Sequence, residues 1–130
     1  MMTTLHHRLL PMIAFAGVVG AASVATAQSS NDLHVLKLAG ERGWRIECEF
    51  ERADDKPLRV RKRGRGDVET IAVRGATGGA CDYVVEADHY GDLKITYTVN
   101  DDFPPNCPFA TEAGQCIGRF SPGADGGFSF

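Results

Sequence analysis

Alternation of apolar and polar residues is the strongest pattern in this chain, and it begins after Gly43. Over residues 44–51 every second side chain is apolar, and the residues between are Arg or Glu. Residues 93–99 repeat the pattern, with Leu, Ile, Tyr and Val separated by Lys and Thr. Successive side chains of a β-strand point to opposite faces, so this period of two predicts strands with one buried and one solvated face.

Shorter runs of the same kind lie between these two segments. Further strands are predicted at residues 58–61, 68–74 and 81–85, and turns rich in Gly and Asp at residues 64–67, 75–79 and 88–92. Short strands at this spacing favour an all-β fold. We expect a small antiparallel meander of five to seven strands, closed as a β-sandwich or a small barrel.

Two segments are less clearly patterned. Asn31–Arg42 fits either a strand or a short helix that ends at Gly43, and the strand is the preferred interpretation. Residues 121–130 are rich in glycine, which is typical of a disordered tail.

The first 27 residues have the three parts of a secretory signal peptide. A polar segment carrying Arg8 precedes the apolar run Leu9–Val19, and small residues follow up to an A-x-A end formed by Ala25 and Ala27. This arrangement predicts cleavage before Gln28. The apolar run is about a dozen residues long, whereas a spanning helix needs about 20, so a retained membrane anchor is the weaker interpretation.

Cleavage leaves residues 28–130, which by length form one exported domain, in the periplasm or outside the cell. It removes Arg8 as the only charged residue and changes the formal net charge from −3 to −4. A net negative charge argues against specific nucleic-acid binding, and no membrane span is expected after cleavage. The oligomeric state is left open.

All four cysteines follow the predicted signal peptide: Cys48, Cys81, Cys107 and Cys116. An even number in a short exported chain predicts disulfides, and the spacing lacks the close pairs that are typical of zinc sites. Cys48 and Cys81 share the inward parity of their strands. We therefore predict a Cys48–Cys81 disulfide in the core and a Cys107–Cys116 disulfide closing a late loop, with no metal and no cofactor.

A run of cations is the surface feature with the most specific implication: Arg59, Arg61, Lys62, Arg63 and Arg65. Arg59 and Arg61 are expected on one strand face, and the other three at the hairpin tip. Guanidinium groups match carboxylates and phosphates, so the partner would be an acidic protein or an anionic polymer. The same charges could instead protect an edge strand from other sheets, or pair with acidic residues of this chain.

Catalytic residues do not form a recognisable set. After the signal peptide the chain has two histidines, His34 and His89, and its few serines lie mostly near the ends. A nucleophile needs a base within hydrogen-bond reach, and no spacing provides one. The question of an enzyme stays open, with the balance against it.

The functional hypothesis is a small exported, disulfide-stabilised, non-catalytic binding module. Inhibition of a secreted hydrolase is one such function, and the loop from Cys107 to Cys116 is the natural presenting element, because rigid scaffolds present loops at a low ordering cost. The alternatives are a small periplasmic or secreted hydrolase and a structural component of the envelope surface.

Overall fold

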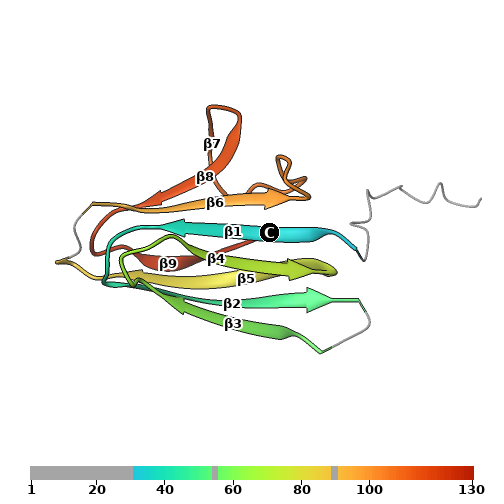
Figure 1. The fold of residues 1–130 in the computed structure, drawn as a ribbon, viewed down its shortest axis with the longest axis horizontal. Coiled ribbons are helices and arrows are strands. Elements are labelled where there is room, and N and C mark those ends of the chain that lie inside the picture. The colour runs from blue at the N-terminus through green and yellow to red at the C-terminus, as the bar shows by residue number, and fades with distance from the viewer. Residues whose placement is uncertain (1–30, 54–55, 89–90) are drawn as a thin grey trace, which may run out of the picture.

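The computed structural model describes residues 31–53, 56–88 and 91–130. The predicted signal peptide, residues 1–27, lies outside the described residues. Nine strands and no helix occur in the described part (Figure 1): β1 (Leu33–Ala39), β2 (Trp44–Arg52), β3 (Leu58–Arg63), β4 (Glu69–Arg74), β5 (Ala76–Val85), β6 (Leu93–Val99), β7 (Thr111–Glu112), β8 (Gln115–Phe120) and β9 (Asp125–Ser129). Accordingly, this part of the chain has no helix long and apolar enough to cross a membrane.

The strands pair antiparallel in two sheets. The first has the order β4-β1-β6-β8-β7 and the second the order β3-β2-β5-β9. Side chains from both sheets form one buried hydrophobic cluster, so the two layers pack face to face as a sandwich (Figure 1). The predicted all-β fold is confirmed. The described strands outnumber the expected five to seven because β7, β8 and β9 lie in segments that the sequence pattern left as loop and tail.

The two strongest alternating segments are confirmed as β2 and β6. Their apolar positions are all buried, with at most 5 % of the residue exposed: Trp44, Ile46, Cys48 and Phe50 on β2, and Leu93, Ile95, Tyr97 and Val99 on β6. Strand β2 lies between β3 and β5, and β6 lies between β1 and β8. Each of these central strands buries one face in the core and exposes the other, which explains why the alternation of apolar and polar residues is so regular here.

The ambiguous segment near the start of the described chain is a strand, β1, rather than a helix. It lies between β4 and β6, with Leu36 and Leu38 fully buried in the core. His34 shares their parity and is fully buried as well. Val35 faces the opposite side of the sheet yet is only 9 % exposed. Burial on both faces hides the period of two and accounts for the ambiguity.

Residues 75–79 differ from the predicted turn. The chain turns at Gly75, whose φ is 83°, and β5 begins at the next residue. Gly79 is part of this strand, and a Cβ atom there would lie 2.7 Å from the Phe130 ring. The glycine therefore makes room for an aromatic ring and does not mark a turn.

The glycine-rich tail is also ordered, in contrast to the expectation of disorder. Strand β9 pairs with β5, and Phe130 continues the ladder through two backbone hydrogen bonds of 3.0 Å with Gly79. A Cβ atom at Gly126 would lie 3.0 Å from Tyr83 Oη, and one at Gly127 would lie 2.8 Å from Asp82 Oδ1. These glycines are needed for close contact with β5.

Both predicted disulfides are confirmed. Cys48 and Cys81 are directly opposite each other on β2 and β5, with their Cα atoms 4.0 Å apart. Cys107 and Cys116 join the loop after β6 to β8, with Cα atoms 5.8 Å apart. Two disulfides indicate an oxidising environment outside the cytoplasm.

Candidate binding surfaces

The predicted basic stretch lies on β3, the edge strand of the second sheet, and on the loop that follows it. Arg59, Arg61 and Arg63 are exposed, as the alternation of the strand requires. Lys62 is not at a hairpin tip with Arg63 and Arg65. It lies opposite Ile46 on the side of β3 that faces the core, and it is half-buried. The strand therefore divides the cations between its two faces, although Arg61, Lys62, Arg63 and Arg65 all line one depression.

Two of these cations are paired with glutamates on β2. Arg59 Nε lies 3.1 Å from Glu49 Oε2, and Arg61 Nη2 lies 3.3 Å from Glu47 Oε1. The pairs are cross-strand neighbours, but the arginine side chains are 67 % and 74 % exposed. Exposed pairs of this kind contribute about 0.2–1 kcal/mol. Pairing with acidic residues of the same chain was one of three interpretations of the basic stretch. It explains the positions of Arg59 and Arg61.

Arg63 has a different environment, because the residue opposite it on β2 is Arg45. Like charges directly across a strand pair destabilise it by about 0.2–1 kcal/mol. No ion pair joins Arg45, Arg63 or Arg65 to any other residue in the described part of the chain. Arg45 was missed from the sequence because its partner becomes visible only when the register of β2 and β3 is known.

These three arginines line a broad, open depression of about 1060 Å³ at one end of the second sheet. Five acidic side chains lie elsewhere on its lining: Glu47, Glu69, Asp82, Glu86 and Asp125. A large, open hollow lined by side chains of both charge signs is suited to a protein surface more than to an enclosed small molecule.

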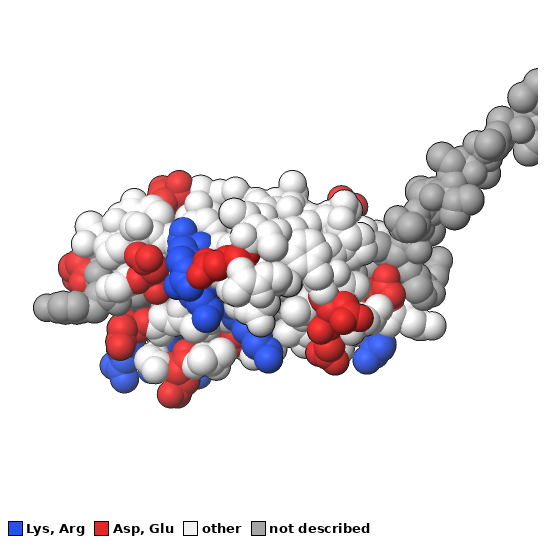
Figure 2. All heavy atoms as spheres, turned by 90° about the horizontal axis from the view of Figure 1, so that it is seen from above, with Lys and Arg blue, Asp and Glu red and all other residues white. Residues whose placement is uncertain are grey.

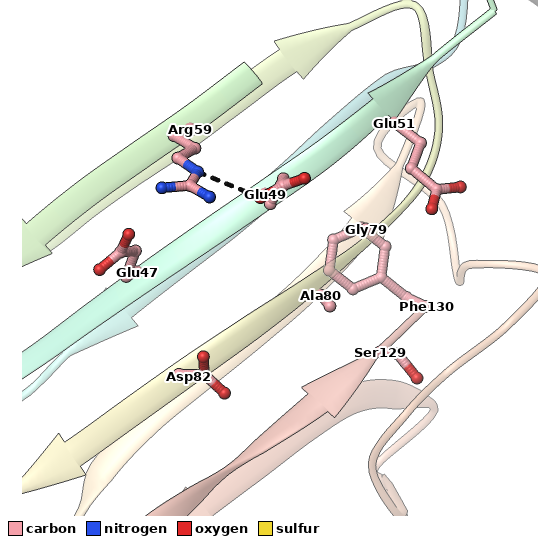
Figure 3. Close-up of a pocket in the computed structure, with 9 residues that line it drawn as sticks. All are labelled: Glu47, Glu49, Glu51, Arg59, Gly79, Ala80, Asp82, Ser129 and Phe130. Carbon is pink, nitrogen blue, oxygen red and sulfur yellow. Dashed lines mark hydrogen bonds and ion pairs between the residues drawn. The ribbon is translucent and has the colours of Figure 1, made fainter. Parts of the chain in front are cut away.

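The middle of the same sheet is acidic (Figure 3). Glu47, Glu49 and Glu51 project from β2 and Asp82 from β5, around a hollow of about 460 Å³ whose floor includes Ala80. Within the described residues no group of three or more His, Cys, Asp or Glu side chains is arranged to hold a metal ion. The second sheet therefore presents a basic edge beside an acidic centre.

On the face of the molecule shown in Figure 2, blue and red atoms adjoin and most of the described surface is white. Arg119 on β8 and Glu112 on β7 form two hydrogen bonds, of 3.0 and 2.8 Å. The bonds from Arg119 lower the pKa of Glu112 below its ordinary value. This pair joins the two strands of the short β7–β8 hairpin, which projects away from the sandwich (Figure 1).

The loop before this hairpin is braced at several points. Pro104 is fully buried, Cys107 is held by its disulfide, and the Phe109 ring occupies the space above Gly118, where a Cβ atom would be 2.7 Å from it. Phe103 stands out from this loop and is 48 % exposed. The predicted presenting loop is thus a rigid element with an exposed aromatic ring beside it.

Comparison of the chain with protein-family models, curated proteins and solved structures gave no match.

The one described histidine is buried and has no access to a substrate. His34 Nδ1 lies 2.7 Å from Tyr97 Oη, and its Nε2 has no hydrogen-bond partner of good geometry among the described residues. Burial lowers the pKa of His34, opposed by the Ala76 backbone and Asp32, and burial raises the pKa of Tyr97. His89 lies outside the described residues. The contact between His34 and the Tyr97 hydroxyl therefore lies in the core and not at a surface that a substrate could reach.

Proposed function

We propose that this protein is an exported, non-catalytic binding module that holds an acidic partner along the β3 edge of the second sheet. The observation that carries the proposal is the cross-strand pair of Arg45 and Arg63, next to Arg65, with no acidic side chain among the described residues paired to any of them. Carboxylates or phosphates of a partner would offset this local repulsion.

We expect Arg59, Arg61 and Lys62 to contribute to binding to different extents. Arg59 and Arg61 are exposed and only weakly held by their glutamates, so they can turn toward a partner at a small cost. Lys62 lies on the core side of β3 and contributes least. The binding surface is therefore centred on Arg45, Arg63 and Arg65.

Rigidity of the scaffold supports a binding role. The Cys48–Cys81 disulfide links β5 to β2, the strand that carries Arg45 and supports β3. A surface that is already ordered loses little conformational entropy on association.

Binding of poly-L-glutamate to immobilised protein tests the proposal. We expect Arg45→Ala with Arg63→Ala to slow association about tenfold at low salt, and Arg61→Ala with Arg63→Ala to slow it somewhat less. Screening over about 8 Å at physiological ionic strength should reduce the difference. The matched control is Lys37→Ala with Arg74→Ala, which removes the same charge from the first sheet. Equal association rates for the control and for the Arg45 variant would contradict the proposal.

A second candidate, an inhibitor of a secreted hydrolase, is favoured by the projecting β7–β8 hairpin with its exposed turn at Ala113 and Gly114. Both turn residues have positive φ, 51° and 74°, as tight hairpins need. Replacement of residues 112–115 by a Gly-Ser linker should then abolish inhibition of a secreted protease or glycosidase. Unchanged inhibition would exclude the hairpin, and a lack of inhibition in the unaltered protein would exclude this candidate.

Export is part of the proposal, and it rests on the signal-peptide pattern and on the two disulfides. N-terminal sequencing of the protein recovered from the exported fraction should give Gln28 as the first residue. A chain that starts at Met1, or that stays with membranes after alkaline extraction, would contradict it.

A further inference from the structure

The sheet edges of the described residues are protected to very different degrees. Strand β3 has four charged residues: Arg59, Arg61, Lys62 and Arg63. Strand β7 has only two residues, and β4 has a charged residue at each end. Natural edge strands commonly use charges, short length, proline or bulges to avoid pairing with other chains. Strand β9 has only Asp125 as a charge, contains no proline, and pairs with β5 without a register shift.

The outward-pointing backbone groups of β9 follow from its pairing with β5. Phe130 and Gly79 exchange both of their hydrogen bonds, and Val85 donates to Ala124 at the other end of the ladder. Hydrogen-bonded and non-hydrogen-bonded pairs alternate along antiparallel strands. The N–H and C=O groups of Asp125, Gly127 and Ser129 therefore point away from β5, and all three residues are exposed.

We propose that β9 pairs antiparallel with β9 of a second copy of this chain, centred on Gly127. In that register Gly127 faces Gly127 of the second copy, and Asp125 faces Ser129 of the second copy. Each of these residues presents both backbone groups outward, so every outward N–H and C=O of β9 gains a partner. The two four-stranded sheets then join into one continuous sheet across a twofold axis.

Side chains in this register are also complementary. On the core-facing side, the Phe128 ring lies opposite Gly126 of the second copy, so a large residue meets one without a side chain. On the outer side, the Asp125 carboxylate meets the Ser129 hydroxyl of the second copy, which can donate a hydrogen bond to it. The strand is therefore self-complementary on both faces, which favours a second copy over an unrelated strand.

The side of the sandwich next to β9 carries aromatic surface that a second copy would cover. Tyr83, Phe109, Phe120 and Phe128 are half-buried and in mutual contact, with ring centroids 4.1 Å apart for Tyr83 and Phe120 and 4.7 Å apart for Phe109 and Phe128. Removing such rings from water adds a hydrophobic contribution to the backbone hydrogen bonds. A short strand gives a small interface, so the dimer should be weak and concentration-dependent.

Sedimentation equilibrium of the purified protein over a range of concentrations tests this proposal. We expect a reversible monomer–dimer equilibrium. Ser129→Pro should abolish it, because proline removes an outward N–H that β5 does not use, whereas Ser129→Ala keeps the N–H and should retain the dimer. Ser129→Glu places a second carboxylate opposite Asp125 of the other copy and should lower the association constant about fivefold or more. Ser129→Lys should raise it.

Circular dichroism and thermal unfolding show whether each variant keeps the monomer fold. A protein that stays monomeric at the highest concentration would overturn the proposal. A dimer that Ser129→Pro leaves intact in a folded variant would also overturn it, as would equal effects of Ser129→Glu and Ser129→Lys. None of these outcomes depends on whether the Arg45 surface binds an acidic partner.

Discussion

The two edges of the second sheet, β3 and β9, are constructed in opposite ways. Strand β3 places an arginine at every second position and is held on its outer side by exposed ion pairs with β2. Strand β9 has glycine at 126 and 127, and is held by close backbone contact and by rings that reach the core. Side chains thus protect one edge from other strands, and their absence leaves the other edge open to them.

This difference assigns different kinds of interaction to the two edges. Exposed guanidinium groups act over a distance, are weakened by salt, and suit an anionic surface. Outward backbone groups act only in contact, are little affected by salt, and suit another strand. A small sandwich can in this way present two kinds of surface from one sheet, and the depression lined by Arg45, Arg63 and Arg65 reaches as far as β9.

The disulfide between β2 and β5 supports both edges, and its removal should have the largest effect. For Cys48→Ala with Cys81→Ala we expect the free energy of unfolding to fall by about 3.8 kcal/mol, compared with about 2.7 kcal/mol for Cys107→Ala with Cys116→Ala, as chain-entropy estimates for the two loops predict. Denaturant unfolding of both double variants measures the difference. The reverse order would show that strain or residual unfolded structure outweighs loop length.

Truncation on the β9 side should cost somewhat less. The Phe130 ring lies 4.8 Å from the Tyr97 ring and 5.6 Å from the Phe50 ring. Because the ring is half-buried, Phe130→Ala should lower the free energy of unfolding by about 3 kcal/mol, at the low end for such truncations. Phe130→Leu is the control and should cost less. A loss below about 1 kcal/mol would mean that β9 is held by its backbone alone.

Acid should weaken the β9 side as well, through His34, whose ring lies 6.2 Å from that of Phe130. Because burial lowers the pKa of His34 in the folded state, the unfolded chain, with an ordinary pKa of about 6.5, takes up the proton first. Stability is then complete above about pH 6.5 and falls by at most about 1.4 kcal/mol per pH unit as the pH drops towards the folded-state pKa.

Thermal unfolding between about pH 8 and pH 5 measures this dependence on acid. The control is His34→Phe with Tyr97→Phe, which removes both hydrogen-bonding partners and leaves neither group unpaired. Its stability should vary less over the same range. An equal variation in the wild type and the variant would assign the pH dependence to other groups.

The smallest effect on stability is expected at β3. Arg59→Ala with Arg61→Ala removes two exposed ion pairs, so the free energy of unfolding should fall by no more than about 1 kcal/mol, and by less at high salt. Chemical unfolding at two salt concentrations measures it. A loss comparable to that of Phe130→Ala would show that the charged edge also holds the sheet together.

The sequence pattern was most informative where a strand has one buried and one solvated face. The parity of β2 and β5 was sufficient to pair Cys48 with Cys81 correctly. It was least informative where a glycine makes room for a side chain of a neighbouring strand. Gly79 makes room for Phe130 and Gly126 for Tyr83, yet from the local sequence each is read as a turn or tail residue. These contacts join residues that are 51 and 43 positions apart in the sequence, which no local pattern can show.

The basic stretch illustrates the same limit for the binding surface. Composition located its cations, and strand parity placed Arg59 and Arg61 on the solvated face. The neighbours of these arginines depend on the register of β2 and β3. That register places Glu47 and Glu49 opposite Arg61 and Arg59, and it places Arg45 opposite Arg63. Whether an exposed charge is neutralised depends on the residue opposite it on the neighbouring strand, and the sequence of one strand does not contain that information.

The position of the Cys48–Cys81 disulfide also has a consequence for the speed of folding. Leu36 on β1 and Tyr97 on β6 are neighbours in the first sheet but lie about 60 residues apart along the chain. Once Cys48 and Cys81 are joined, the path between them shortens to about 30 residues, which lowers the entropic cost of closing that loop by about 0.6 kcal/mol. If this closure occurs before the rate-limiting step, the oxidised chain should assemble its first sheet about threefold faster than the reduced chain, although the disulfide itself lies in the second.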